Sequence, residues 1–294
     1  MSKFIEIIEV GPRDGLQRES TPISTDDKIR MIHNLVDAGI NSIQVTSFVH
    51  PKYVPQMADA EDVCRGIKKK EGVTYSGLVL NMKGLDRAHD AGLTHVDMSI
   101  SASDRHSRKN ANISLEDALS SFKDMLSKAD ELNLNVRAGI QCVFGYYEPD
   151  VTQEIVLDIV KHYVEWGIES LSLADSTGMA NPAQIKEMLS AIKPVIGEIP
   201  VVLHLHDTRG MGLANVVAAI EAGCTRFDTA FGGMGGCNFI PEALGNIATE
   251  DTVNMLHAMG YETGVDIEKV AQVSKHLQTL IGQQLPGKMY RLVG

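Results

Sequence analysis

The stretch VVLHLHDTRGMG (residues 201–212) begins as an apolar run and ends with two histidines placed two residues apart. A run of branched apolar residues is typical of a strand that is buried on both faces, as in a parallel sheet. Because side chains alternate between the two faces of a strand, His204 and His206 share one face while Leu205 points the other way. The segment 210–222 that follows has the period of a helix. We interpret this region as a strand–helix unit whose strand ends in two converging imidazoles.

The same unit recurs along the chain. Short apolar runs alternate with amphipathic segments, most of which end in the Ala-Gly or Trp-Gly pairs expected at helix C-termini. Eight such units in 294 residues favour an α/β fold of the (β/α)8 TIM-barrel type over a doubly wound sheet, whose G-x-G-x-x-G motif is absent from the sequence. We predict one TIM-barrel domain over residues 1–294, with an additional C-terminal helical segment and tail at 265–294. The strands are predicted at 4–10, 41–46, 75–80, 95–100, 134–142, 168–173, 200–206 and 226–230, and helices at 25–38, 114–133, 151–166 and 210–222.

Composition and charge exclude several classes of function. The hydrophobic content of 44% is sufficient for a full-sized core, while the net charge of −11 argues against a nucleic-acid partner. No apolar run approaches the roughly 20 residues needed to span a bilayer, and the N-terminal sequence has no signal-peptide pattern. The four cysteines are too sparse to staple a chain of this size, which suits a reducing compartment. We predict a soluble cytoplasmic protein with no nucleic-acid or membrane partner.

Polar residues gather where a TIM barrel has its active site, at the carboxyl ends of the strands and in the loops that follow them. The first strand is followed by Arg13 and Asp14 in the motif GPRDG, and the last strand by Asn246 at the end of the run GGMGGCNFIPEALGN. With the two histidines, these residues offer oxygen and nitrogen ligands without a thiolate. Such a set suits Mg²⁺ or Mn²⁺ with open positions for substrate and water, and zinc is less favoured.

Each of these features also has a simpler interpretation. The His-x-His pair can be two structural histidines, and GPRDG can be a turn closed by a salt bridge between Arg13 and Asp14. The glycine-rich run can be a surface loop, although four glycines around a thiol also make a lid able to bring Cys237 over the barrel mouth. The joint occurrence of these features favours a metal site. The remaining cysteines fall within helix or strand patterns and are expected in the core: Cys64, Cys142 and Cys224.

Six motifs follow one another along the chain: EVGPRDGLQ (9–17), TSFVHPKYVPQM (46–57), NMKG (81–84), HLHDTRG (204–210), GGMGGC (232–237) and GNIATED (245–251). Together they resemble 3-hydroxy-3-methylglutaryl-CoA lyase, a family of the DRE-TIM metallolyases. The resemblance implies a TIM barrel, a divalent cation, an acyl-CoA substrate and cleavage of a 3-hydroxy-3-methylglutaryl thioester to acetyl-CoA and acetoacetate. Similar proteins form homodimers or higher homo-oligomers, and we expect the same here. Carried over residue by residue, the family's metal ligands match Asp14, His204, His206 and Asn246, its catalytic arginine matches Arg13, and its loop cysteine matches Cys237.

Two strands depart from the family's pattern. Gln44, just before VTSF, stands where the family has the glutamate of its DRE signature, and an amide cannot carry a proton as a carboxylate can. On the fifth strand Arg137 is retained, but the segment AGIQCVFGYYEPD (138–150) differs from the usual family sequence around a cysteine-proline turn. Both strands help to form the acyl pocket in the family.

The family resemblance and the two departures from it leave three alternative functions. The leading one is a 3-hydroxy-3-methylglutaryl-CoA lyase. The second keeps the fold and the metal but cleaves a related 3-hydroxyacyl thioester, such as citramalyl-CoA or a longer 3-hydroxyglutaryl-CoA. The third is a catalytically silent barrel that binds a CoA ligand, which the complete set of metal and catalytic residues disfavours.

The expected chemistry is a retro-Claisen cleavage. A cation that binds the tertiary hydroxyl lowers its pKa, and Arg13 stabilises the negative charge of the departing thioester enolate. Cys237 is the candidate proton donor to the enolate carbon. Because Gln44 cannot accept the hydroxyl proton, we expect this proton to pass to a ligand histidine, to Asp175 at the end of the sixth strand, or to water. The candidate catalytic residues are therefore Arg13, Gln44, Asp175 and Cys237, and the candidate substrate-binding residues are Arg137, Ser103, Lys52 and Lys83. We expect the two lysines in the loops after the second and third strands, where each can be a point charge for the CoA phosphates or equally a solvated surface residue.

Overall fold

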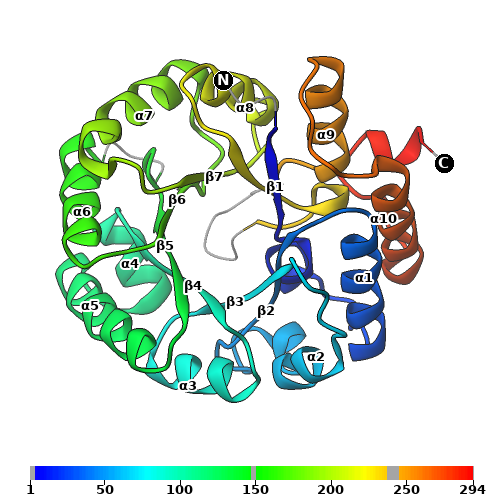
Figure 1. Cartoon of the computed structure of the whole chain (residues 1–294), viewed down its shortest axis with the longest axis horizontal. Helices are drawn as coiled ribbons and strands as arrows, with labels where there is room; N and C mark the ends of the chain where they lie inside the picture. The colour runs from blue at the N-terminus through cyan, green and yellow to red at the C-terminus, as the bar shows by residue number, and fades with distance from the viewer. Residues whose placement is uncertain (1–3, 147–149, 237–244, 294) are drawn as a thin grey trace.

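The computed structural model of the protein describes residues 4–146, 150–236 and 245–293. Within these residues, eight parallel strands close into a barrel in chain order, and the last strand pairs with the first. The helices surround this barrel (Figure 1). The predicted (β/α)8 fold is confirmed. The strands are β1 Glu6–Glu9, β2 Ser42–Ser47, β3 Thr74–Val79, β4 His95–Ser101, β5 Asn135–Gln141, β6 Ser170–Asp175, β7 Val201–Leu205 and β8 Arg226–Thr229.

Several helices begin where the sequence provides a capping side chain. Ser24 and Ser114 each accept the backbone N–H three residues later, which fixes the first turns of α1 and α5. At the start of α7, Asn181 and Gln184 form a reciprocal capping box, followed by a proline in the first turn. The helices are α1 Thr25–Asp37, α2 Ala60–Gly66, α3 Met82–Asp90, α4 Asp104–Ala111, α5 Leu115–Glu131, α6 Gln153–Glu165, α7 Pro182–Ile196, α8 Gly212–Glu221, α9 Thr249–Ala258 and α10 Ile267–Ile281.

The main hydrophobic core lies between the strands and the surrounding helices. There the rings of Phe122 on α5 and Tyr163 on α6 stack with their centroids 4.4 Å apart. Inside the barrel, Val202 shares a face of β7 with His204 and packs in a small separate cluster with Ile8 and its neighbours. The barrel lumen thus has an apolar layer next to the polar residues of its mouth.

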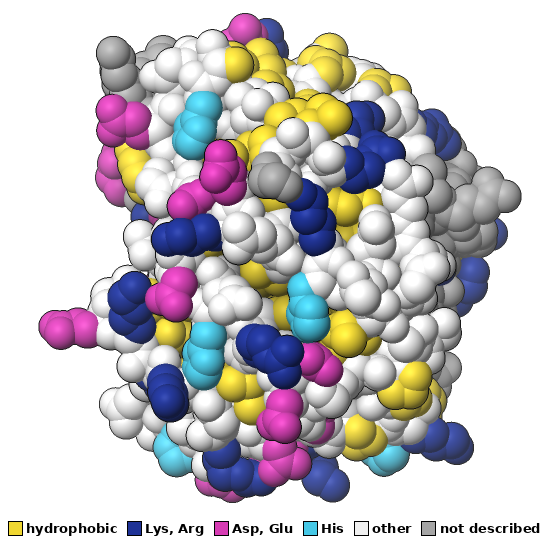
Figure 2. Space-filling view, turned by 90° about the vertical axis from the view of Figure 1, so that its right-hand side faces the viewer, with side chains coloured by type: hydrophobic (Ala, Val, Ile, Leu, Met, Phe, Trp, Pro, Cys, Tyr) yellow, Lys and Arg dark blue, Asp and Glu magenta, His cyan; other side chains and the backbone are white. Residues whose placement is uncertain are grey.

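The C-terminal segment contributes α10, which packs against α1 and α9 on the right-hand side of Figure 1. This helix confirms the predicted additional C-terminal helical segment. On the same side of the molecule, acidic and basic side chains are interspersed (Figure 2). None of the helices in the described ranges combines the length and the apolar character that crossing a membrane requires.

Three local predictions need correction. The fifth strand ends at Gln141 rather than at Cys142, whose φ of 56° is left-handed and incompatible with a strand. The seventh strand ends at Leu205, and His206 instead forms an isolated antiparallel bridge with Asn246. Lys83 lies in the first turn of α3 and not in a loop, because the preceding Asn81 side chain caps this helix.

Candidate metal centre

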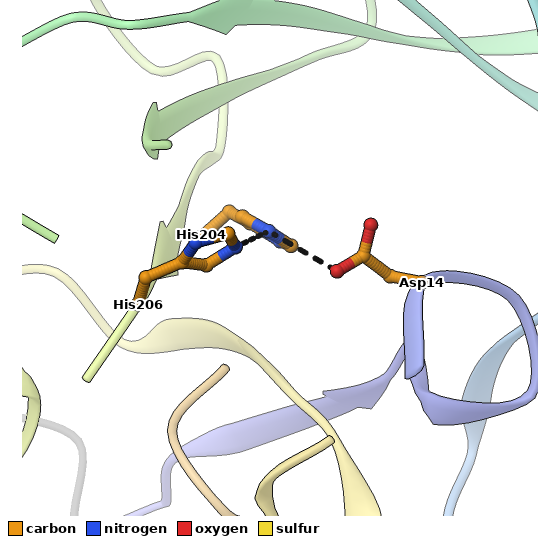
Figure 3. A group of neighbouring side chains, drawn as sticks. All are labelled: Asp14, His204 and His206. Atoms are coloured by element: carbon orange, nitrogen blue, oxygen red, sulfur yellow. Dashed lines mark hydrogen bonds and ion pairs between the residues drawn. The ribbon is translucent and has the colours of Figure 1, made fainter. Parts of the chain in front are cut away.

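Two histidines and one aspartate meet at the mouth of the barrel. His204 lies on β7 and His206 directly follows this strand, and their Nε2 atoms are 3.2 Å apart. Asp14 faces them from the turn after β1, with its Oδ2 4.0 Å from Nε2 of His204 (Figure 3). All three residues are buried, and their candidate ligand atoms lie within 4.8 Å of one another. This group of side chains is a potential metal-binding triad.

The motif GPRDG folds as a single π-helical turn over Gly11–Gly15. The carbonyl oxygen of Val10 accepts the backbone N–H of Asp14 at 2.7 Å and so closes the turn. Gly11 has no room for a side chain, because a Cβ would lie 2.4 Å from the ring of Phe231. The motif is therefore a turn, as its simpler interpretation required, and this turn also directs Asp14 at the histidines.

The side-chain amide of Asn246 lies beside the triad. Its Nδ2 donates hydrogen bonds to Oδ2 of Asp14 at 2.7 Å and to the carbonyl oxygen of Met234 at 2.9 Å. Its Oδ1 is buried and accepts no hydrogen bond from the described residues. The backbone of Gly235 passes close by, since a Cβ there would lie 2.3 Å from Nδ2 of Asn246. A buried amide oxygen that has no donor, in a residue that contacts Asp14, can serve as a cation ligand.

The protonation states at the triad suit a cation. Burial raises the pKa of the Asp14 carboxyl, but the adjacent Arg13 and the two histidines outweigh this effect and lower the pKa to about 2. Burial, together with the neighbouring His204, lowers the pKa of His206 to about 4. At neutral pH, Asp14 is therefore ionised and His206 is neutral, which are the forms that bind metal ions. The donor set and its charge fit a hard divalent cation.

Arg13 lies beside the triad and contacts Gln44. Its Nη1 donates to Oδ1 of Asp14 at 2.5 Å, and its Nε donates to Oε1 of Gln44 on β2. An amide oxygen accepts from a guanidinium without neutralising its charge, whereas a carboxylate at the same position would pair with it as an ion. In the described part of the chain, Arg13 thus pairs with one carboxylate rather than with two.

Two aspartates in the lumen, Asp97 and Asp228, belong to no sequence motif. Asp228 on β8 places Oδ2 3.1 Å from Nδ1 of His204, and its Oδ1 accepts a 2.5 Å hydrogen bond from Nη1 of Arg137. Nε of Arg137 also donates to Asp97 on β4. The signal in the sequence was a single aspartate inside each of two short strands predicted to be buried, because an ionised residue stays buried only with a partner. Arg137, predicted to bind substrate, lies between these two carboxylates.

Two buried glutamates outside the lumen also went unnoticed in the sequence. Oε1 of Glu9 accepts the backbone N–H groups of Gly11 at 2.7 Å and of Phe231 at 3.0 Å. Glu250, in the first turn of α9, accepts the N–H of Gly232 at 3.0 Å. The two carboxyl groups hold the backbone turn at the start of the glycine-rich run, and Glu9 links this turn to the GPRDG turn.

Asp175 occupies the end of β6, as predicted, but its carboxyl group has a structural task. Its two oxygens accept the backbone N–H groups of Met179 at 3.0 Å and Ala180 at 3.1 Å in the loop that follows. Burial raises its pKa to about 6, against the opposing effect of these hydrogen bonds. Its role as a proton acceptor stays a prediction.

The other predicted residues lie away from these contacts or outside the described ranges. The Ser103 hydroxyl caps α4 and donates to the carboxylate of Asp150, while Lys52 is exposed in the loop after β2 and Lys83 is exposed on α3. Cys237 lies outside the described residues. The substrate-binding and catalytic roles of these four residues stay predictions.

The fold and the site together define a class of protein: a (β/α)8 barrel with a potential divalent-metal site at its mouth. Comparison with known proteins agrees with this class. A profile of the HMGL-like family matches residues 4–277, and the chain belongs to this family.

Named relatives and solved structures resemble the chain over nearly its whole length. It is 44% identical over 287 residues to the hydroxymethylglutaryl-CoA lyase YngG of Bacillus subtilis, a match that covers 97% of this chain and 96% of that protein. It is 37% identical to the human mitochondrial hydroxymethylglutaryl-CoA lyase, covering 98% of this chain and 89% of that protein. Among solved structures, an HMG-CoA lyase from Acinetobacter baumannii in complex with coenzyme A and 3-methylmalate superposes with a TM-score of 0.95 at 38% identity, covering 99% of this chain and 95% of that one.

Proposed function

We propose that this protein is a divalent-metal-dependent carbon–carbon lyase that cleaves 3-hydroxy-3-methylglutaryl-CoA to acetyl-CoA and acetoacetate. The observation that carries the proposal is the convergence of Asp14, His204 and His206 at the barrel mouth with Arg13 beside them. The identity to curated lyases over nearly the whole chain supports the same activity. A catalytically silent barrel is disfavoured, because such a protein needs no buried carboxylate held against two imidazoles at its mouth.

Asp14, His204, His206 and Asn246 would hold the cation, for which we propose Mg²⁺ or Mn²⁺. Such a cation supplies an electrophile that makes the tertiary hydroxyl of the substrate more acidic. Arg13 faces the same space and stabilises the negative charge that develops on the thioester when the carbon–carbon bond breaks. Asp175 and a ligand histidine are the candidates to receive the hydroxyl proton, and Cys237 is the candidate donor to the enolate carbon.

Gln44 favours a second candidate, a lyase for a related 3-hydroxyacyl-CoA such as citramalyl-CoA or a longer 3-hydroxyglutaryl-CoA. Gln44 contacts Arg13 with an amide oxygen, so the mouth carries one negative charge fewer than a site with glutamate at this position. The relative from Acinetobacter baumannii was solved with 3-methylmalate, a smaller hydroxy diacid than 3-hydroxy-3-methylglutarate. A barrel of this family can therefore accept a hydroxy diacid of another length.

A panel of thioesters tests both candidates. The purified protein, with Mg²⁺ and after metal removal, is assayed for release of the shorter acyl-CoA from 3-hydroxy-3-methylglutaryl-CoA, citramalyl-CoA and a longer 3-hydroxyglutaryl-CoA. We expect the highest kcat/KM with 3-hydroxy-3-methylglutaryl-CoA and no turnover without metal. If Gln44→Glu raises kcat/KM for this substrate by orders of magnitude, the second candidate replaces the first. Absence of turnover on every thioester would leave only the silent barrel.

Three further features belong to the proposal. The protein acts as a single domain over residues 1–294, forms a homodimer or a higher homo-oligomer, and works in the cytoplasm. The family resemblance supports the oligomer. The cytoplasmic location rests on the cysteine usage, and among named relatives are both cytoplasmic and mitochondrial lyases.

A further inference from the structure

A chain of polar contacts crosses the barrel lumen and ends at the metal site. On β3, the hydroxyl of Ser76 donates to Oδ2 of Asp97 at 2.6 Å, and Oδ1 of Asp97 accepts from Nε of Arg137. From β5, Nη1 of Arg137 reaches across the lumen to Oδ1 of Asp228 on β8. Oδ2 of Asp228 then meets Nδ1 of His204 at 3.1 Å. Side chains of four strands are thereby linked to the imidazole of His204 on β7.

The carboxylate of Asp228 lies between two nitrogens. A guanidinium can only donate, so Oδ1 of Asp228 is an acceptor toward Arg137. Oδ2 belongs to the same carboxylate, which forms a 2.5 Å ion pair with Arg137, and so it also acts as an acceptor. The partner of Oδ2 must therefore donate, which requires a proton on Nδ1 of His204. In a neutral ring with its proton on Nδ1, the other nitrogen, Nε2, carries the lone pair and lies toward His206 and Asp14.

Arg137 fixes the orientation of this carboxylate. Its planar group donates at the same time to Asp97, its direct neighbour in the β4–β5 register, and to Asp228 on a strand that is not adjacent. A fork of this kind holds both acceptors in one plane, which a single ammonium group cannot do. Its positive charge also offsets the cost of burying two aspartates within the lumen.

We propose that Asp228 and Arg137 are positioning residues that set the tautomer and the ring orientation of His204, so that its Nε2 faces the cation. Carboxylates that accept the second ring N–H of a ligand histidine often raise metal affinity in this way. The inference rests on the proposed metal site and assigns to Arg137 a task other than the substrate contact predicted from the sequence. It does not depend on which thioester is cleaved.

Mn²⁺ binding to the full-length protein without substrate tests the proposal, with free Mn²⁺ measured by electron paramagnetic resonance. Asp228→Asn keeps the size of the side chain, but its amide NH₂ must face one of the two donors, Nη1 of Arg137 or Nδ1 of His204. We expect the Kd for Mn²⁺ to rise about 10- to 100-fold, the range typical of lost outer-shell partners. Arg137→Lys keeps the charge but loses the fork, and we expect a smaller rise in the same direction.

The matched control is Glu61→Gln, which makes the same carboxylate-to-amide change at an arginine pair, Glu61–Arg87, between α2 and α3. This variant is expected to bind Mn²⁺ as the unchanged protein does. If Asp228→Asn, folded by circular dichroism, also keeps the unchanged Kd, the positioning role is overturned. The same holds if Arg137→Lys raises KM for the thioester with unchanged Mn²⁺ affinity, which would support substrate contact instead.

A measurement on the unchanged protein does not depend on any variant being folded. In metal-free protein labelled with ¹⁵N-histidine, the two-bond couplings of His204 report its tautomer, and we expect the proton on Nδ1. A proton on Nε2 would overturn the proposal. If the unchanged protein binds no Mn²⁺ at all, the proposed metal site fails and this inference fails with it, whereas equal binding by all variants removes only the inference.

Discussion

Two pairs of buried carboxyl groups in this protein differ in the direction of their pKa shifts. Asp14 and Asp228 line the lumen, and each contacts an arginine. Glu9 and Glu250 lie outside the lumen around the turn at Phe231–Gly233, where their partners are backbone N–H groups and hydroxyls. Burial opposes ionisation in both pairs, but only the lumen pair is offset by positive charge. The pKa of Asp14 therefore falls to about 2, whereas burial raises that of Glu9 to about 8.

The comparison distinguishes carboxyl groups suited to a cation site from carboxyl groups that hold a backbone turn. A cation site needs carboxylates that are ionised and oriented, and the arginines of the lumen provide this condition. A turn that supports the site needs acceptors for its backbone N–H groups, and a protonated carboxyl group can serve as such an acceptor. One member of each pair meets at the GPRDG turn, which carries Asp14 and donates to Glu9 through the N–H of Gly11. Substitutions in the two pairs should therefore have different consequences.

The largest effect is expected from removing the charge in the lumen. Asp14→Asn removes the carboxylate of a proposed metal ligand and leaves Arg13 without its ion partner. We expect Mn²⁺ affinity to fall by more than the about 10- to 100-fold typical of outer-shell losses, and turnover to fall with it. Mn²⁺ titration and steady-state kinetics at saturating metal check this expectation. Full Mn²⁺ affinity in Asp14→Asn would show that this carboxylate is not a ligand.

A smaller effect is expected from crowding the site through the backbone. In Gly235→Ala, the new Cβ would lie 2.3 Å from Nδ2 of Asn246 and 2.9 Å from Oδ2 of Asp14, at a φ of +115°. We expect weaker Mn²⁺ binding together with a loss of stability, because both side chains must move. Gly223→Ala is the control, since this glycine has a φ of +95° and nothing within 4 Å of its Cβ position. It should lose stability through backbone strain alone and keep its Mn²⁺ affinity.

The smallest effect on Mn²⁺ affinity is expected from substitutions in the second pair, Glu9 and Glu250. In Glu9→Gln, Oε1 can still accept from Gly11 and Phe231, and the new NH₂ can donate to the hydroxyl of Thr249, which lies 2.7 Å from Oε2. Because this pattern matches that of a protonated glutamate, we expect near-normal Mn²⁺ affinity at neutral pH. A loss of affinity as large as that of Asp14→Asn would show that the two pairs are not functionally separate.

The raised pKa of Glu9 predicts that the stability of the protein depends on pH, and Glu9→Gln tests this prediction. The pKa of Glu9 rises from 4.5 to about 8 on folding, mainly through burial and also through the nearby Glu250. Between these values the folded protein retains a proton that the unfolded chain has lost, so the contribution of Glu9 to stability is present below pH 4.5 and is lost as the pH rises toward 8. Urea unfolding at several pH values should show a steeper decline for the unchanged protein than for Glu9→Gln, by on the order of a few kcal/mol in total. Parallel stability curves would contradict the raised pKa.

The sequence by itself determined the barrel and most of the proposed metal site. Eight repeats of one strand–helix pattern fix the fold class, because strands buried on both faces and linked by helices have few ways to pair. The period of two along β7 placed His204 and His206 on one face, and the position of Asp14 and Asn246 after the first and last strands placed them at the same end. These are local properties, which a reader of the chain can see.

Only the tertiary structure decided which side chains meet across the lumen. Arg137 joins Asp97, its neighbour in the sheet, to Asp228, which is 91 residues away on a strand that is not adjacent. Such a contact depends on the diameter and closure of the barrel, and no local pattern encodes these. For the same reason, the sequence could not tell that Asp228 orients a histidine while Glu9 holds a turn. The charge of a buried carboxyl group is set by its neighbours in space, and folding alone brings those neighbours together.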